Sequence, residues 1–210
     1  MQISDLAKAG CSVWLDDLSR AKLSGTDAHS LPPRISNSGV VGVTTNPAIF
    51  KAAISDATEY SADIAALSGK SVEEVITNLT TDDVRIACDL FTDIYRTSNG
   101  FDGRVSIEVD PRSAHDTAAT VKEGKALWQI IDRPNVLIKV PATLAGLPAI
   151  TELIGAGISV NVTLIFSIER YTQVIEAYIA GIELADKNGV DPTQIHSVAS
   201  FFISRLDTAI

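Results

Sequence analysis

Short runs of hydrophobic and β-branched residues alternate along the chain with longer segments of helical periodicity. Six runs have the length and composition of β-strands. They are SVWLD (12–16), VVGVTT (40–45), RVSIEV (104–109), NVLIKV (135–140), SVNVTLI (159–165) and HSVASFF (196–202). Strands that alternate with helices indicate βα units and a parallel sheet, and therefore an α/β fold.

Helical spacing is clearest after the fifth run. Ser167 is placed to cap the N-terminus of this helix, and Gly189 to end it. Ser71 and Glu74 fit a capping box at the start of another helix, between the second and third runs. The helix after the fifth run has one apolar face, formed by Ile168, Tyr171, Ile175, Tyr178, Ile179 and Ile182. The segment between the second and third runs carries an apolar stripe of Val84, Cys88, Phe91 and Tyr95.

The sequence favours a closed barrel over an open nucleotide-binding sheet. No G-x-G-x-x-G or G-x-x-x-x-G-K-[ST] pattern occurs, although such a turn usually marks a nucleotide-binding sheet. Enzymes with a (β/α)8 TIM barrel instead place polar residues at the carboxyl ends of many strands. No linker, low-complexity tract or repeat divides the sequence. We therefore expect residues 1–210 to form a single (β/α) barrel domain, truncated after strand six of eight.

The fifth predicted strand separates apolar from polar residues. Successive strand residues point to opposite faces. Val160, Val162 and Leu164 share an aliphatic face that suits the helix-covered exterior of a barrel. Asn161 and Thr163 share the other face, which suits the interior near its open end.

The fourth predicted strand carries a lysine. Val136, Ile138 and Val140 lie on one face of this strand, and Lys139 lies on the other. An ammonium group in such a run must reach solvent, pair with a carboxylate or lose its proton. A neutral amine is a nucleophile that condenses with carbonyls. From this strand alone, Lys139 is either a catalytic nucleophile or a structural lysine paired with an acid.

Other strands also end in polar residues. They are Asp16 in the first strand, Asn46 after the second, Glu108 in the third, Ser200 in the sixth and Arg205 just beyond it. Taken singly, each has a structural explanation such as a helix cap, a turn or a surface charge. Together, carboxylates, a lysine, amides, hydroxyls and an arginine at one end of consecutive strands favour carbon–carbon bond chemistry on a phosphorylated sugar.

Composition narrows the possible partners and location. The formal net charge of −9 disfavours non-specific binding to nucleic acid or anionic lipid. No apolar stretch reaches the roughly 18 residues that a membrane span requires. The first ten residues indicate a short amphipathic helix and not a secretory signal. Cys11 and Cys88 cannot build a disulfide framework, so reduced thiols in the cytoplasm are expected.

Six sequence blocks resemble, in order, the strand-end motifs of transaldolases. They are WLDD, GVTTNPAIF, GRVSIEVDPR, VLIKVPAT, GISVNVTLIFS and SVASFFISR. The combination of TTNPA, IKVPAT and NVTLIFS is specific, although any one of them alone is weak. The resemblance implies a transferase of the pentose phosphate pathway. It moves a dihydroxyacetone unit from sedoheptulose 7-phosphate or fructose 6-phosphate to an aldose phosphate, with no metal and no cofactor.

The same resemblance implies a role for each polar residue. Lys139 forms a Schiff base with the donor, and Asp16 is the acid/base of carbon–carbon cleavage. Glu108 and Thr163 hold a water that shuttles protons during imine formation. The resemblance also implies the substrate contacts: Asn46, Asn161 and Ser200 hold donor hydroxyls, Arg205 binds phosphate, and Phe202 shapes the pocket near the water.

The sequence departs from the family pattern at its C-terminal end. It stops at Ile210, in the first turn of the helix expected after strand six. Strands seven and eight, the dimerising C-terminal helices and a second phosphate-binding arginine of the family are not in the sequence. We therefore expect a truncated form, and the resemblance leaves its activity and oligomeric state open.

Three alternatives to a transaldolase remain. A fructose-6-phosphate aldolase-like enzyme is disfavoured because such relatives tend to carry glutamine at the position of Glu108 and tyrosine at that of Phe202. An aldolase of the deoxyribose-phosphate type is disfavoured because its nucleophile lies on strand six, where this sequence has no lysine. The third alternative is an inactive barrel fragment that acts only as a binding module.

Overall fold

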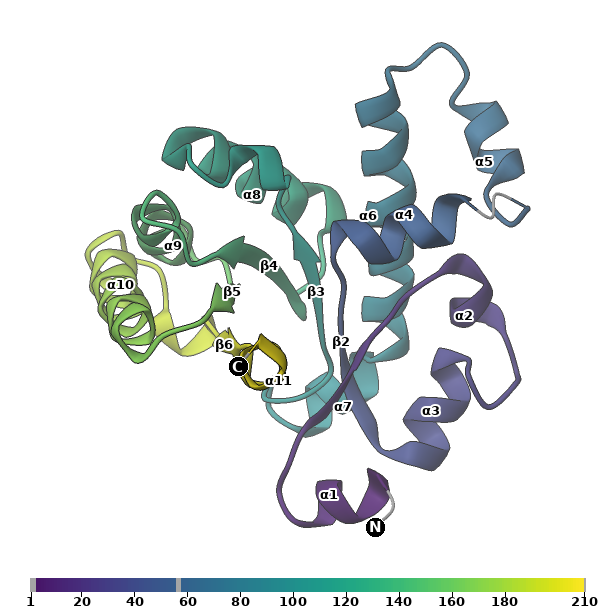
Figure 1. Cartoon of the computed structure of the whole chain (residues 1–210), viewed down its shortest axis with the longest axis horizontal. Coiled ribbons are helices and arrows are strands. Elements are labelled where there is room, and N and C mark those ends of the chain that lie inside the picture. Colours follow the sequence, from purple (N-terminus) through teal and green to yellow (C-terminus); the bar gives the residue numbers. More distant parts are fainter. Residues whose placement is uncertain (1–2, 56–57, 210) are drawn as a thin grey trace. The chain divides into compact units, whose positions relative to one another are not determined.

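The computed structural model describes residues 3–55 and 58–209 (Figure 1). Contacts within the chain divide it into two compact units. The first consists of Met1–Ile107 and Ile131–Val136, and the second of Glu108–Ile130 and Leu137–Ile210. Because of this division, strand β3 (Arg104–Glu108) ends in the second unit. Strand β4 (Val136–Pro141) begins in the first unit.

The first unit holds three parallel strands that pair in chain order: β1 (Val13–Asp16), β2 (Val40–Thr44) and β3. The helix expected at the start of the chain is α1 (Ile3–Lys8), while Met1 and Gln2 lie outside the described residues. The other helices of this unit are α2 (Arg20–Ser24), α3 (Leu31–Ser38), α4 (Pro47–Ser55), α5 (Ser61–Ala66), α6 (Val72–Leu90) and α7 (Thr92–Thr97).

The second unit also holds parallel strands that pair in chain order: β4, β5 (Val160–Ile165) and β6 (Ser197–Phe201). The Val109 N–H, just after β3, donates to the Lys139 C=O at 3.1 Å. The helices are α8 (Thr117–Ile131), α9 (Gly146–Gly155), α10 (Ile168–Lys187) and α11 (Ile203–Ala209), with 3-10 turns η1 (Pro111–Ser113) and η2 (Pro192–Gln194). Ile210 lies outside the described residues.

Parallel strands that alternate with helices and pair in chain order make this an α/β fold. The order is that of consecutive βα units in a partial (β/α)8 barrel, as predicted, and neither unit contains the reversal of strand order that a doubly wound sheet requires. Each observed strand lies within two residues of its predicted bounds. That residues 1–210 act as one domain stays a prediction. Within residues 3–55 and 58–209, no helix has the length and apolar character needed to cross a bilayer.

The predicted helix caps are confirmed. Ser71 and Glu74 form a reciprocal capping box at α6: the Glu74 N–H donates to the Ser71 Oγ, and the Ser71 N–H to a Glu74 carboxylate oxygen. The Ser167 Oγ accepts the Arg170 N–H at 3.1 Å at the start of α10. Gly189 follows the end of α10 with φ +74°, a conformation that glycine adopts without steric cost.

Helix α10 buries a face of mainly small residues, whereas several large residues of its predicted apolar face are exposed. Its buried residues are Val174, Ala177, Gly181 and Ala185. Gly181 approaches α9 so closely that an added Cβ would lie 2.7 Å from the Ile154 Cβ. By contrast, Ile168 and Ile179 of the predicted apolar face are 79% and 51% exposed. The helix is therefore confirmed, but its contact with α9 uses a different face.

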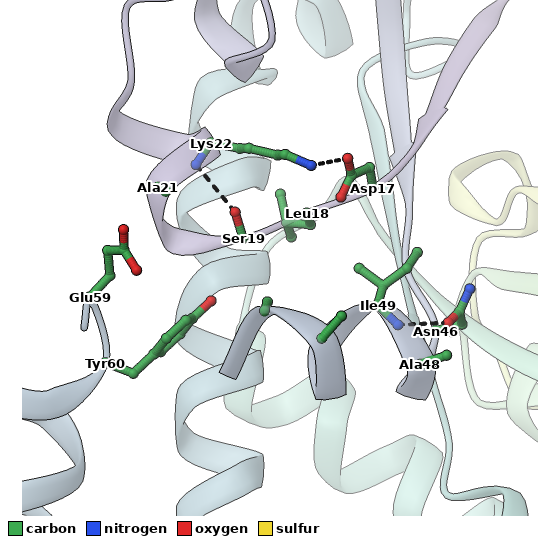
Figure 2. A pocket seen from close by; sticks show the side chains of 12 residues that line it. Asp17, Leu18, Ser19, Ala21, Lys22, Asn46, Ala48, Ile49, Glu59 and Tyr60 are labelled. Carbon is green, nitrogen blue, oxygen red and sulfur yellow. Dashed lines mark hydrogen bonds and ion pairs between the residues drawn. The ribbon is translucent and has the colours of Figure 1, made fainter. Parts of the chain in front are cut away.

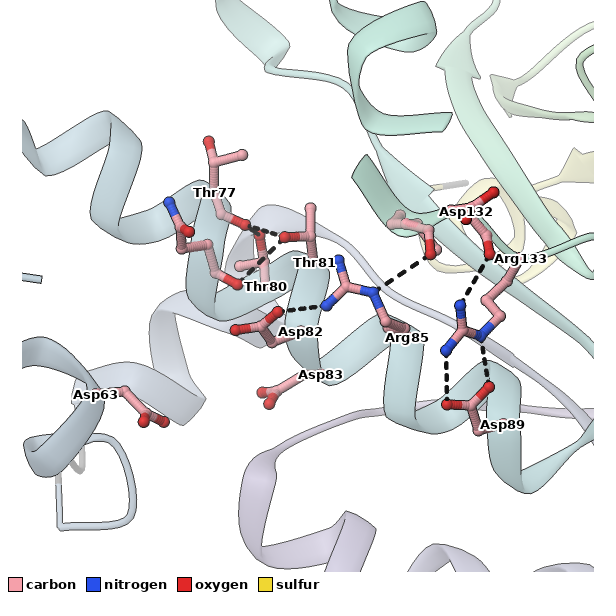
Figure 3. A network of polar contacts seen from close by, with 12 residues as sticks. Asp63, Thr77, Thr80, Thr81, Asp82, Asp83, Arg85, Asp89, Asp132 and Arg133 are labelled. Carbon is pink, nitrogen blue, oxygen red and sulfur yellow. Dashed lines mark hydrogen bonds and ion pairs between the residues drawn. The ribbon is translucent and has the colours of Figure 1, made fainter. Parts of the chain in front are cut away.

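Polar contacts hold α6 against the segment 131–136 within the first unit (Figure 3). The Arg133 guanidinium pairs with both carboxylate oxygens of Asp89, at 2.5 and 3.1 Å. The Arg85 Nε donates to the Ile131 C=O at 3.3 Å. On another side of α6, the fully buried carboxylate of Asp83 accepts hydrogen bonds from the Tyr60 hydroxyl and the Arg20 guanidinium.

Strand β5 departs from strict alternation at Leu164. Val160 and Val162 are buried, as the predicted aliphatic face requires, but Leu164 is exposed and Ile165 is buried. The pairing with β6 shifts between Val162 and Ile165, and Leu164 has φ +60°. The prediction that Leu164 shares the face of Val160 and Val162 is therefore wrong, because one extra residue is inserted at this point.

Candidate active site

Lys139 lies near the carboxyl end of β4, and the whole strand is buried. Its neighbours Val136, Ile138 and Val140 are fully buried, as expected for a parallel strand covered on both faces. Lys139 itself is only 5% exposed. Of the three outcomes that the sequence allowed, escape of the ammonium to solvent is therefore excluded in this structure.

A carboxylate lies beside this lysine. The Lys139 Nζ is 3.3 Å from Glu108 Oε2, and the two side chains are 6% and 12% exposed. The contact confirms that a strand-end acid pairs with the lysine. A carboxylate at this distance can also accept a proton from the ammonium, and a neutral amine could then attack a carbonyl.

Strand pairing continues the polar row onto β5 and β6. Lys139 pairs in register with Asn161, whose side chain is almost fully buried. The Ser200 hydroxyl of β6 donates to the Asn161 Oδ1 at 3.0 Å. Thr163 lies two residues further along β5, and its buried hydroxyl has no hydrogen-bond partner among the residues that the structure describes.

Aromatic rings and a guanidinium meet just beyond the ends of β5 and β6. The rings of Phe166 and Phe202 stack with centroids 5.5 Å apart and an interplanar angle of 22°. The Arg205 Cζ lies 4.5 Å from the Phe202 ring centroid, within the range of a cation–π contact. The second unit thus brings the predicted Phe202 and Arg205 together, and it adds Phe166.

The first unit holds the two remaining predicted residues, at the carboxyl ends of adjacent strands. Asp16 is the exposed last residue of β1. Asn46 follows β2, and its Oδ1 accepts the Ile49 N–H at 3.0 Å, so the side chain caps α4. A pocket of about 530 Å³ in the first unit is lined in part by Asn46, Asp17 and Lys22. Figure 2 shows the side chains of these lining residues. Asp17 forms an ion pair with Lys22. This structural contact distinguishes Asp17 from Asp16, the residue that is predicted to be catalytic.

Comparison with known proteins identifies the family of the chain. The sequence model described as transaldolase/fructose-6-phosphate aldolase matches residues 13–210. The chain belongs to this family. It is 58% identical to Transaldolase 1 of Streptomyces coelicolor over 207 residues, which cover 98% of this chain and 54% of that protein. It is 56% identical to the transaldolase of Mycolicibacterium smegmatis over 210 residues, which cover 99% of this chain and 56% of that protein.

The chain spans about half the length of the curated relatives that it matches. Membership of the transaldolase/fructose-6-phosphate aldolase family confirms the resemblance inferred from the strand-end blocks. The roles of the individual residues stay predictions.

Sequence reasoning missed two residues near the candidate site. Phe166 lies in the NVTLIFS block but was not singled out, since an aromatic residue just after a strand is common. Leu164 was assigned to the aliphatic face by alternation. A bulge of this kind is usually marked by glycine or asparagine, so a leucine gave no signal.

Proposed function

We propose that the protein is a transaldolase that uses Lys139 as a Schiff-base nucleophile. It transfers a dihydroxyacetone unit from sedoheptulose 7-phosphate or fructose 6-phosphate to an aldose phosphate in the pentose phosphate pathway of the cytoplasm. The buried Lys139–Glu108 contact, at 3.3 Å, is the observation that carries this proposal. More than 50% identity to proteins named transaldolase also supports it.

The chemistry begins with the proton on the lysine. Glu108 takes a proton from the Lys139 ammonium, and the neutral amine attacks the C2 carbonyl of the ketose. Loss of water from the resulting carbinolamine gives a protonated imine, with Glu108 and Thr163 moving the protons. Glu108 belongs to β3 and Thr163 to β5, the strands on either side of the lysine's strand β4. Neither side chain therefore needs a separate element to hold it near Lys139.

The imine then acts as an electron sink. Asp16 removes the proton of the C4 hydroxyl, the C3–C4 bond breaks, and its electron pair moves into the imine to form an enamine. The aldose phosphate leaves, and the enamine attacks the aldehyde of the acceptor, whose new alkoxide takes the proton back from Asp16. Water then hydrolyses the product imine, which releases the new ketose phosphate and regenerates the Lys139 amine. In this scheme Asn46, Asn161 and Ser200 hold donor hydroxyls. The sugar phosphates are the partners that this scheme requires.

A fructose-6-phosphate aldolase is the second candidate, since the family includes both activities. In that enzyme water protonates the enamine, and free dihydroxyacetone is released. Glu108 and Phe202 favour the transferase, because Phe202 offers no hydroxyl proton to the enamine.

Borohydride trapping tests the proposal. Reduction in the presence of fructose 6-phosphate should attach a three-carbon adduct to Lys139, and peptide mass spectrometry locates it. Lys139→Met should abolish both labelling and turnover. Lys125→Met, at an exposed lysine of α8, is the matched control and should leave both intact. A label on Lys122 or Lys125, or no label at all, would refute the assignment. Release of dihydroxyacetone at an equal rate with and without erythrose 4-phosphate would favour the aldolase.

A further inference from the structure

Leu164 in β5 adopts a left-handed backbone conformation that leucine rarely takes. Its φ is +60°, where the Cβ of a bulky residue crowds the following carbonyl oxygen. The residue is 39% exposed, so deep burial of its side chain does not explain the conformation. Such a conformation persists only where the surrounding backbone fixes it, and residues of this kind gather at functional sites.

Hydrogen bonds from the residues that directly follow β4 and β6 fix the backbone around Leu164. On one side, the Ala142 N–H donates to the Thr163 C=O at 2.8 Å. On the other side, the Phe202 N–H donates to the Ile165 C=O at 3.1 Å. The residues before and after Leu164 are thus hydrogen-bonded to different segments of the chain. The backbone of Leu164 joins them by adopting a positive φ.

The result is one extra residue in β5. Val162 pairs with Ala199 and Ile165 pairs with Phe201, so three steps along β5 match two along β6. Bulges are rare in parallel pairs, and next to active sites they redirect side chains. A shift of one residue moves every later side chain to the opposite face of a strand.

Phe166 follows the bulge, and its side chain makes a defined contact. Its ring stacks on Phe202 at 5.5 Å, and the Arg205 Cζ lies 4.5 Å from the same Phe202 ring. The Phe202 N–H bond to Ile165 anchors the base of this stack next to the bulge. Phe166 directly follows β5, so the extra residue at Leu164 changes the direction in which the chain carries this ring out of the strand.

We propose that Leu164 is a positioning residue, whose bulge stacks Phe166 against Phe202 and thereby orients Arg205 toward the phosphate of the substrate. The identity of this ligand rests on the proposed function. The stack and the bulge do not.

Two substitutions separate the backbone role of Leu164 from a packing role. Leu164→Gly removes the side chain but accepts φ +60° without strain. Leu164→Val keeps an aliphatic side chain but disfavours the left-handed region and favours a regular strand. The proposal expects Leu164→Gly to keep the KM for fructose 6-phosphate near that of the parent protein. Leu164→Val should lose about a hundredfold in kcat/KM, because displacement of a substrate-orienting group by about 1 Å has this effect.

The KM and an inhibition constant show where the loss arises. In Leu164→Val the KM for fructose 6-phosphate and the inhibition constant of inorganic phosphate should rise together, while borohydride still labels Lys139 at saturating donor. Leu164→Asn, which tolerates the left-handed region, should resemble Leu164→Gly. As a control, Leu144→Val and Leu144→Gly change an exposed leucine of the second unit that has no positive φ, and should alter neither constant.

A packing role predicts the reverse order, with Leu164→Gly worse than Leu164→Val, and that order would overturn the proposal. Equal phosphate inhibition in the two variants would also overturn it. If Lys139 is never labelled, the proposed function fails instead. The rise in melting temperature caused by inorganic phosphate then still tests the bulge, since it should be smaller in Leu164→Val than in Leu164→Gly.

Discussion

The contact between Lys139 and Glu108 predicts a specific pattern of stabilities. The Nζ and Oε2 atoms are 3.3 Å apart, and both side chains are largely buried. At an effective dielectric constant of about 20, two unit charges at this distance attract by about 5 kcal/mol. Desolvation of both ions opposes this attraction, so the pair itself adds little net stability.

Removing one partner is therefore expected to be costly, and removing both is not. Glu108→Gln leaves a buried ammonium without its carboxylate, and Lys139→Met leaves a buried carboxylate without its ammonium. Each single change should lower the free energy of unfolding by about 3–5 kcal/mol. The double variant should lose less than either single variant, because no uncompensated charge remains.

Urea unfolding at pH 7, followed by circular dichroism, measures these four free energies. Lys125→Met serves as the control and should change the free energy by less than about 0.5 kcal/mol, since it removes an exposed charge. If the costs of Glu108→Gln and Lys139→Met simply add in the double variant, the two groups do not interact. The proton transfer that we assign to Glu108 would then be wrong as well.

Two further predictions concern the second unit. Burial raises the pKa of Glu123, whose Oε1 accepts the Asp110 N–H at 2.9 Å. The favourable contribution of a raised pKa is present below the unfolded value and is lost as pH rises through the folded value. Glu123→Gln keeps the acceptor and should therefore gain stability over the parent at pH 7 but not near pH 4, and equal differences at the two pH values would contradict this. Gly181→Ala should destabilise the protein by about 1–3 kcal/mol in thermal unfolding, because the added Cβ would lie 2.7 Å from that of Ile154. As a control, Ala180→Gly at an exposed position of the same helix should cost about 1 kcal/mol. A Gly181→Ala variant that is more stable than the parent would refute the close contact.

The strands could be predicted because their sequence signal is local. Parallel strands that are covered on both faces appear as continuous hydrophobic runs. The run NVLIKV (135–140) correctly predicts β4, which is Val136–Pro141 and is buried throughout. Helix caps are local as well, which is why Ser71 and Ser167 were identified correctly. The conformation of Leu164 could not be predicted, since it depends on hydrogen bonds that Thr163 and Ile165 accept from residues distant in sequence, just beyond β4 and β6.

Helix α10 shows a second limit of periodicity. The spacing of Ile168, Ile175 and Ile179 correctly indicates a helix, but these residues do not form its contact with α9. That contact depends on Gly181 and its small neighbours, which allow the two helices to approach closely. Periodicity weights residues by hydrophobicity, and close packing depends on size, so the two signals can identify different faces.

The two interpretations of Lys139 that the sequence leaves open are compatible with each other. A lysine paired with an acid was the structural alternative, and a nucleophilic amine was the catalytic one. In the proposed mechanism the amine becomes nucleophilic only when a nearby group takes its proton, and Glu108 at 3.3 Å is that group. The pairing therefore does not weaken the case for catalysis. In that mechanism the pairing offsets the burial of the ammonium charge, and it places the proposed proton acceptor beside the amine.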